Sequence, residues 1–338
     1  MAVRPFLYLG DSVCKCVFST LHRKPKLRTD EIYRQTRNFK KLRGRTRVSE
    51  ESFTKDYVER GPLHFSKMLK PFAFTVVFSG TTFVAAAIWE YERIRERTYR
   101  IINHYNPLKI RRTGWRHDME IWWKNLAEGR KIFMSICFLN VMVFLAWRLP
   151  VFQKTMVQYF CTNPASRAVC WPMLLSSFSH YSFLHLAANM YALHSFSSLA
   201  VAALGKEQFL ALYLTCGVVS SFASNLFKVT FGLQGLSLGA SGAVMGVFGF
   251  ICTQFPDTYF SIIFLPMYKF TAGMALKAIM SLDILGCLLR WQYFDHAGHL
   301  GGVLFGMFWQ AWGNANIWQK REPILTLWHE LRGPPGSR

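Results

Sequence analysis

The sequence predicts an all-helical (all-α) polytopic membrane protein, in which one leading apolar span is followed by a bundle of six more. The first observation is composition: 51% of the 338 residues are hydrophobic, yet the formal net charge is +21, which suits a membrane protein with basic ends better than a soluble domain. The second is that residues 168–205 hold no Lys, Arg, Asp or Glu. The third is that apolar runs of helical length recur between residues 71 and 312.

Arg and Lys are gathered in the first 131 residues. They do not interleave with aromatic residues on a globular pattern, as a nucleic-acid surface would require. We therefore expect a lipid bilayer, and no nucleic acid, as a partner of this chain. The eight cysteines include no C-x-x-C pair, and spacing leaves open whether Cys161 and Cys170 form a disulfide.

Residues 1–49 form a basic leader. They are rich in Arg, Lys, Ser and Thr, and their acids are Asp11, Asp30 and Glu31. This composition is typical of a mitochondrial targeting (transit) peptide, and no long apolar stretch follows Arg4 as a secretory signal would require. A disordered basic tail is the alternative.

The first span is expected at 71–89 and a polar connector at 92–131, both within an N-terminal region at 50–131. The span carries no charge, Pro71 suits the first turn of a helix, and Trp89 suits its interfacial end. The connector has mixed charge and three tryptophans, so we expect part of it to form an amphipathic helix on the membrane surface.

The other six spans are placed in a core at 132–315, followed by a tail at 316–338. They are expected at Ile132–Trp147, Pro172–Leu204, Gln208–Phe227, Ser241–Gln254, Thr271–Leu289 and His296–Trp312. The run Tyr259–Met267 is broken by a proline, and we expect a loop that dips into the interface. The sixth span carries Lys277 and Asp283, two charges to which the sequence assigns no role.

The fifth span opens on Ser241, which stands between Gly239, Ala240 and Gly242. Small neighbours leave the hydroxyl uncrowded and allow a tight turn. A helix of 14 residues rises only about 20 Å against about 30 Å of hydrocarbon, so one that reaches the far surface leaves Ser241 roughly 10 Å below its own surface. A serine at that depth suggests a group that a substrate must reach; the alternative is a small residue at a helix start.

Other polar side chains lie within the apolar spans, where an unpaired polar group costs several kcal/mol and is a functional hypothesis by default. The third span holds His180, His185, Asn189 and His194, and the seventh holds His296 and His299. His185 and Asn189 are four residues apart and share one helix face. They serve either the same site as Ser241 or a structural bridge between helices.

Two glycine pairs predict that the fifth and seventh spans touch. Gly242 and Gly246 form a G-x-x-x-G face in one span, and Gly302 and Gly306 form one in the other, a pattern that allows close helix approach. Because alternate spans enter from the same surface, the third, fifth and seventh spans share an entry side. The serine, the histidines and the amide would then meet at one depth, as a nucleophile, a base and hydrogen-bond donors.

Three motifs occur in order on these spans: H-x-x-x-N at 185–189, G-A-S-G at 239–242 and H-x-x-G-x-x-x-G at 299–306. Together they resemble the rhomboid intramembrane serine proteases, over roughly residues 132–313. The basic leader, the extra leading span and F-D-H-A-G-H-L-G-G at 294–302 are similar to the mitochondrial branch of that family.

The resemblance implies a site and a reaction. Ser241 would be the nucleophile, and His299 rather than His296 the general base. The residues implied on the oxyanion and substrate side are His185, Asn189, Gly239 and His180. The implied reaction is hydrolysis of peptide bonds in or beside the membrane segment of single-span proteins of the mitochondrial inner membrane, with substrates linked to quality control, dynamics and apoptosis. No cofactor and no metal is implied.

The chain departs from the family pattern at two positions. Gly298 stands before the base where rhomboids usually have Ala, and Met245 stands four residues after the serine where many carry Tyr packed on the histidine ring. A thioether contacts an imidazole or aromatic edge more weakly and less rigidly than that ring does.

Three alternatives stay open. One is a catalytically inactive rhomboid-like module that binds membrane proteins, against which the intact Ser241 and His299 argue. Another is a metal-dependent membrane enzyme or transporter, although H-x-x-H without a glutamate and a third ligand is a weak metal pattern. Its histidines would be His180, His185, His194, His296 and His299. Finally, Asp295 is either the N-cap of the seventh span, which we favour, or an acid that orients the base.

Two signals disagree about orientation. A mitochondrial leader places the N-terminus in the matrix, and seven spans then place the C-terminus in the intermembrane space. The connector 92–131 carries eleven Lys and Arg against five acids and would face the intermembrane space, against the positive-inside rule. We follow the leader, because that rule is statistical and the basic segment before Pro71 also satisfies it. The sequence does not predict the oligomeric state.

Overall fold

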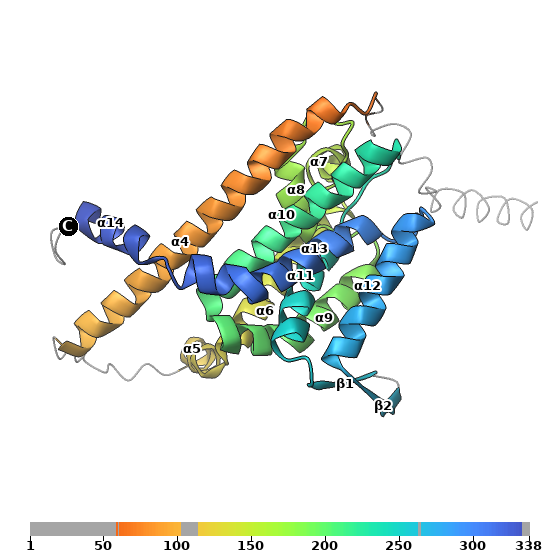
Figure 1. Cartoon of the computed structure of the whole chain (residues 1–338). Helices are drawn as coiled ribbons and strands as arrows, with labels where there is room; N and C mark the ends of the chain where they lie inside the picture. Colours follow the sequence, from red (N-terminus) through yellow and green to blue (C-terminus); the bar gives the residue numbers. More distant parts are fainter. Residues whose placement is uncertain (1–58, 60, 103–113, 263–264, 333–338) are drawn as a thin grey trace, which may run out of the picture. The chain divides into compact units, whose positions relative to one another are not determined.

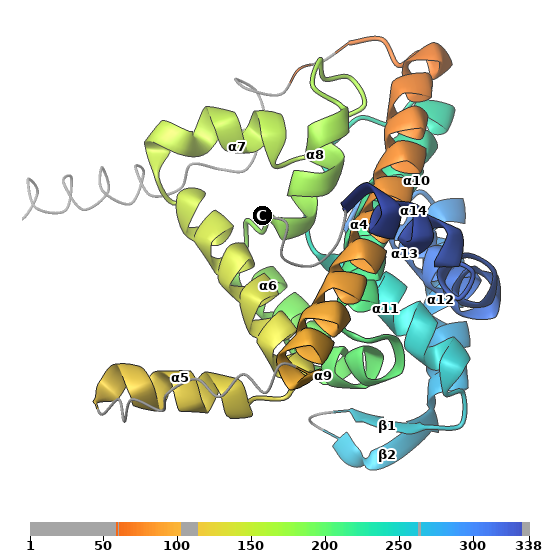
Figure 2. The same ribbon diagram turned by 90° about the vertical axis from the view of Figure 1, so that its left-hand side faces the viewer.

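The computed structural model describes residues 59, 61–102, 114–262 and 265–332, and these residues are mostly helical (Figures 1 and 2). The predicted leader at 1–49 lies outside the described residues. Three of the described helices are long and apolar enough to cross a membrane by length and composition, and one shorter apolar helix accompanies them. They are Phe65–Ile102, Glu128–Ala146 and Lys206–Phe231, with Ser241–Gln254 as the shorter one.

Helices follow the predicted order, and one hairpin interrupts them. The helical elements are η1 (Phe65–Met68), α4 (Leu69–Ile102), α5 (Trp115–Asn125), α6 (Glu128–Ala146), η2 (Pro150–Phe152), α7 (Gln153–Tyr159), α8 (Cys170–Leu175), η3 (Ser176–Phe178), α9 (Phe183–Leu204), α10 (Lys206–Phe231), α11 (Ser241–Gln254), α12 (Ala272–Leu288), α13 (His296–Phe308), the π-helical η4 (Trp309–Trp318) and α14 (Glu322–Arg332). The hairpin strands are β1 (Tyr259–Ile262) and β2 (Leu265–Thr271).

Several predicted elements are confirmed. Helix α11 begins at Ser241 and ends at Gln254, as the sequence predicts, and α10 and α12 agree closely with the fourth and sixth predicted spans. The connector contains the helix α5, as expected, and all three of its tryptophans lie on that helix. Its placement on a membrane surface stays a prediction.

The third predicted span, Pro172–Leu204, is wrong as one continuous helix. It is divided into α8, η3 and α9, and the backbone is extended at Ser179 and Ser182. The intervening sequence S-S-F-S-H-Y-S is rich in hydroxyls, which compete with helical hydrogen bonding. Ser179 Oγ, for instance, accepts from the indole Nε1 of Trp147 at 2.8 Å. His180 therefore lies in the break before α9, and not in a span.

The expected loop at Tyr259–Met267 is a β-hairpin. Strands β1 and β2 are antiparallel, with Phe260 opposite Phe270, so the fold is not strictly all-α. The run is rich in aromatic and β-branched residues, which favour strands. Its proline is compatible with this, because both strands of a two-stranded sheet are edge strands.

Helix α4 is longer than the predicted span 71–89, and its charged second half packs on the C-terminal helix α14. Trp328 Nε1 donates to a Glu92 carboxylate oxygen at 2.8 Å, and Arg321 Nη2 donates to Glu90 at 2.6 Å. The seventh predicted span is also longer than expected, because η4 continues α13.

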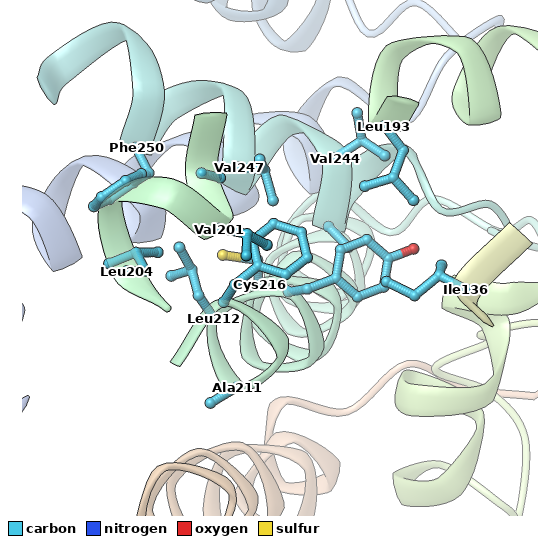
Figure 3. Close-up of a cluster of buried hydrophobic side chains, with 14 of the residues drawn as sticks. Ile136, Leu193, Val201, Leu204, Ala211, Leu212, Cys216, Val244, Val247 and Phe250 are labelled. Atoms are coloured by element: carbon cyan, nitrogen blue, oxygen red, sulfur yellow. The ribbon is translucent and has the colours of Figure 1, made fainter. Parts of the chain in front are cut away.

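Helix α10 is central to the packing. It contacts α4, α11 and α13, and it is the most buried of the three long apolar helices. Figure 3 shows side chains of α6, α9, α10 and α11, among them Ile136, Leu193, Leu212 and Val247, gathered in one buried cluster. Because α11 packs in this cluster, buried contacts fix the position of the helix whose first residue is Ser241.

Candidate active site

Helices α11 and α13 touch through their glycine faces. A Cβ added at Gly302 would lie 2.1 Å from the carbonyl oxygen of Gly242, and one added at Gly306 would lie 1.9 Å from that of Gly246. Side chains cannot fit at such distances, so the two backbones are in direct contact. The predicted contact between the two faces is confirmed.

This contact brings the predicted nucleophile and base together. Ser241 is the first residue of α11, and His299 lies in the first turn of α13. The distance between His299 Nε2 and Ser241 Oγ is 3.0 Å, a hydrogen-bond distance. Both residues are half-buried. At this distance an imidazole nitrogen can accept the proton of a hydroxyl.

His180 and His185 both contact the turn that precedes Ser241. The backbone N–H of Ala240 donates to His180 Nε2 at 3.3 Å, and the rings of the two histidines meet edge to face with centroids 4.9 Å apart. Gly239 has φ +134°, and a Cβ there would lie 2.7 Å from Cε1 of His185. Glycine at this position therefore serves both the backbone conformation and the close approach of the His185 ring.

Asn189 lies one turn further along α9 and is 7% exposed. Its side-chain amide donates to the backbone carbonyl of His185 at 2.9 Å, which is the one side-chain hydrogen bond that the described residues give it. The structure thus brings five of the predicted residues together around the Ser241 turn, while Asn189 is bonded within its own helix. A primary amide has two N–H donors, so the second remains for another acceptor.

Asp295 caps helix α13. Its Oδ1 accepts from the backbone N–H of Gly298 at 3.0 Å, so the favoured interpretation, an N-cap, is confirmed. Burial raises the pKa of Asp295, but the Lys228 ammonium, the hydroxyls of Ser224 and Ser237 and the Gly298 amide outweigh burial and lower it below its usual value. The carboxylate is therefore ionised at neutral pH and stabilises the helix that carries His299.

A different acid approaches the base. Asp283, on α12, has its Oδ1 2.7 Å from His296 Nδ1 and 3.4 Å from His299 Nδ1. The sequence signal was present, because a lone carboxylate inside an apolar span is a functional hypothesis by default, but its partners are one helix away. Lys277, the other charge in that span, is exposed.

Comparison with known proteins agrees with these motifs. A family model described as Rhomboid domain matches residues 167–314, which include all the predicted site residues. The mitochondrial presenilin-associated rhomboid-like protein of Homo sapiens is 47% identical over 280 residues, which cover 80% of this chain and 73% of that protein. This chain belongs to the rhomboid family.

Two further relatives show how widely the similarity extends. Rhomboid protein 1, mitochondrial, of Saccharomyces cerevisiae is 32% identical over 201 residues, covering 59% of this rhomboid and 58% of the yeast protein. Rhomboid protease GluP of Bacillus subtilis is 30% identical over 138 residues, covering 41% of this rhomboid and 25% of the bacterial protein. The presenilin-associated rhomboid-like proteins of Pongo abelii and Homo sapiens align with more of this rhomboid, 80% of it.

Among the described residues of this rhomboid, one group has metal-ligand types close together. The ligand atoms of Asp283, His296 and His299 lie within 4.8 Å of one another. The 2.7 Å separation of Asp283 Oδ1 and His296 Nδ1 is that of a hydrogen bond, and it is shorter than the distance of about 3.3 Å between neighbouring ligands of a tetrahedral zinc ion. Of the other histidines in the metal alternative, His194 packs on Phe133. The donor set fits a hydrogen-bonded acid better than it fits a metal site.

Proposed function

We propose that this rhomboid is an intramembrane serine protease of the mitochondrial inner membrane. It would hydrolyse peptide bonds in or beside the membrane segment of single-span proteins, and would act in mitochondrial quality control, dynamics and apoptosis. The observation that carries the proposal is the 3.0 Å distance between Ser241 Oγ and His299 Nε2, made between helices whose contact leaves room for no side chain. The relatives that are named as mitochondrial or as a protease support it.

In the proposed reaction, His299 Nε2 takes the proton of Ser241 while Oγ attacks the scissile carbonyl carbon. The same imidazole then gives the proton to the leaving amine, and an acyl ester remains on Ser241. A water molecule, deprotonated by His299, then attacks the ester carbon; as the bond to Ser241 Oγ breaks and the second product leaves, His299 returns the proton to Oγ. No cofactor and no metal takes part in this scheme.

The developing oxyanion needs donors beside Ser241 Oγ. We assign this role to the backbone N–H of Ser241 and to the side chains of His185 and Asn189. The N–H of Ala240 is already used, because it donates to His180 Nε2. His180 and Gly239 are accordingly proposed to shape the turn.

Seven crossings agree with the contacts at the helix ends. On the side where α4 begins, Asn163 Nδ2, in the loop after α7, donates to the carbonyl of Glu59 at 2.9 Å. On the other side, Arg93 of α4 pairs with Glu207 of α10 at 2.5 Å. If each helix crosses the membrane in turn, the start of α4 and the loop after α7 lie on one side, and the end of α4 and the start of α10 lie on the other. We therefore propose one leading span and a six-span core within 132–315, with a leader at 1–49 and a tail at 316–338.

The proposal is tested by labelling the full-length protein with a fluorescent fluorophosphonate, a reagent for activated serines. We expect the wild type to be labelled and Ser241→Ala to remain unlabelled, because the reagent reports a hydroxyl whose proton a base removes. Ser220→Ala is the matched control, because Ser220 lies on the neighbouring helix α10 with its Oγ beside Gly242. The Ser220→Ala protein should be labelled like the wild type. Equal labelling of Ser241→Ala would refute Ser241 as the nucleophile.

We also propose that the N-terminus lies in the matrix and the C-terminus in the intermembrane space. Helix α14 packs on the second half of α4, which supports opposite sides for the start of α4 and for α14. A tag placed beyond Leu331 should be digested by external protease once the outer membrane is opened, while a matrix marker stays intact. A tag protected until the inner membrane is dissolved would contradict this orientation.

A further inference from the structure

The His296 ring packs closely against helix α12. Asp283 and Gly286 are three residues apart and lie on one face of α12. A Cβ added at Gly286 would lie 2.4 to 2.6 Å from atoms of the His296 ring, so this ring lies flush against the helix. Its Nδ1 is 2.7 Å from Asp283 Oδ1. Asp283, a residue that is 3% exposed, thereby has its carboxylate held at a defined position.

From that position the carboxylate reaches the proposed base. Asp283 Oδ1 is 3.4 Å from Nδ1 of His299, while Nε2 of the same ring is 3.0 Å from Ser241 Oγ. The His299 ring therefore lies between a carboxylate and the proposed nucleophile. Asp283 Oδ2 has no hydrogen-bond partner in the described part of the chain, so no other group competes with the two histidines for this carboxylate. The 3.4 Å separation is longer than an ordinary hydrogen bond, but hydrogen bonds of a catalytic site are often long without substrate and shorten in the complex.

We propose that Asp283 is a positioning residue for His299, and that His296 holds the carboxylate in place; this inference rests on the proposed serine–histidine pair. A hydrogen-bond acceptor beside His299 Nδ1 favours the neutral tautomer that is protonated at Nδ1. In this tautomer Nε2 is unprotonated and faces Ser241, as a general base requires. The negative charge also stabilises the imidazolium that forms when His299 takes the proton.

The position on α11 at which many rhomboids carry a Tyr packed on the histidine ring is Met245 in this chain. Met245, one turn after Ser241, packs in the apolar cluster of Phe248, Leu276 and Val303. A carboxylate held by a second histidine fixes the ring through direction and charge, which a thioether does not.

A purely structural role for Asp283 predicts different results. In that case the carboxylate would only anchor His296 and join α12 to α13. Removing His296 would then be as harmful as removing the carboxylate, and a double variant would lose no more activity than either single one. If Asp283 acts on His299, its removal still lowers kcat when His296 is absent.

The test compares Asp283→Asn, His296→Leu and the double variant in proteoliposomes with a single-span substrate. We expect Asp283→Asn to lower kcat by about 10² to 10⁴-fold, by analogy with the loss of the acid in a soluble serine protease, with little change in KM. Fluorophosphonate labelling of Ser241 should slow in parallel, because labelling also depends on proton removal by His299. Since labelling needs no peptide binding, the effect cannot then be attributed to weaker substrate binding. His296→Leu should lose less, and adding Asp283→Asn to it should lower kcat further.

Two comparisons keep the test decisive. Glu207→Gln changes another buried carboxylate, which is paired with Arg93 at the far end of α10, and should leave kcat unchanged. If Asp283→Asn aggregates, Asp283→Glu and Asp283→Gln differ in charge at equal length, and the Glu variant should be the faster one. Wild-type kcat and labelling in Asp283→Asn, or equal rates in the Glu and Gln variants, overturn this inference alone. Cleavage by Ser241→Ala would overturn the proposed reaction as well.

Discussion

Replacing His299 with Ala is expected to lower kcat for cleavage of a single-span substrate by about 10⁶-fold, the loss seen when a soluble serine protease loses its nucleophile or base. Ser241→Ala should be equally inactive, and the double variant no worse, because the two side chains act as a unit through their 3.0 Å contact. The measurement is steady-state cleavage by purified protein, with circular dichroism to show that each variant is folded.

Two other histidines serve as comparisons. His194→Ala removes a ring that packs on Phe133 and should leave kcat unchanged. His296→Ala should retain far more activity than His299→Ala, since its contact is with Asp283 and not with Ser241. The opposite ranking would show that the wrong histidine has been assigned as the base. Loss of activity on chelation, with full activity in Ser241→Ala, would favour the metal alternative instead.

The second large effect is expected from Gly302→Ala. The added methyl group would meet the Gly242 carbonyl oxygen at 2.1 Å, so α13 must move away from α11 and carry His299 with it. A displacement of about 1 Å costs on the order of 100-fold in rate. We therefore expect kcat to fall at least 100-fold, and Gly246→Leu to do the same from the opposite helix.

Gly80→Ala on α4 is the matched control for this prediction. It makes the same chemical change in a helix, yet nothing lies within 4 Å of the added Cβ, so activity should be unchanged and stability slightly higher. Melting temperatures of all variants separate loss of the site from loss of the fold. Full activity in Gly302→Ala would mean that activity does not depend on the close contact between α11 and α13.

The residues of α11 and its neighbours were predictable because the relevant signals are local. An uncharged run between a glycine-rich turn and Pro256 defines a short helix with Ser241 at its start, and the G-x-x-x-G spacing marks the faces on which backbones can touch. These signals, read in the two segments alone, identified α11 and its contact with α13 without knowledge of how the remaining helices pack.

Local hydropathy failed where side-chain hydrogen bonds or strand pairing compete with the helix. The hydroxyl-rich run around Ser179 is apolar enough to extend a span, yet its side chains bond to neighbours such as Trp147. The hairpin of β1 and β2 likewise depends on pairing between Phe260 and Phe270, and a run of apolar residues does not reveal such a partner.

The sequence alone identified Ser241 and His299 as a pair, because motifs name residue types at fixed spacings along one chain. It left Asp283 without a role, because the partner of a buried charge depends on how α12 is rotated against α13 and on how closely the two helices approach. That geometry is decided by Gly286, whose missing side chain admits the His296 ring, and so by packing between helices rather than by the pattern within either one.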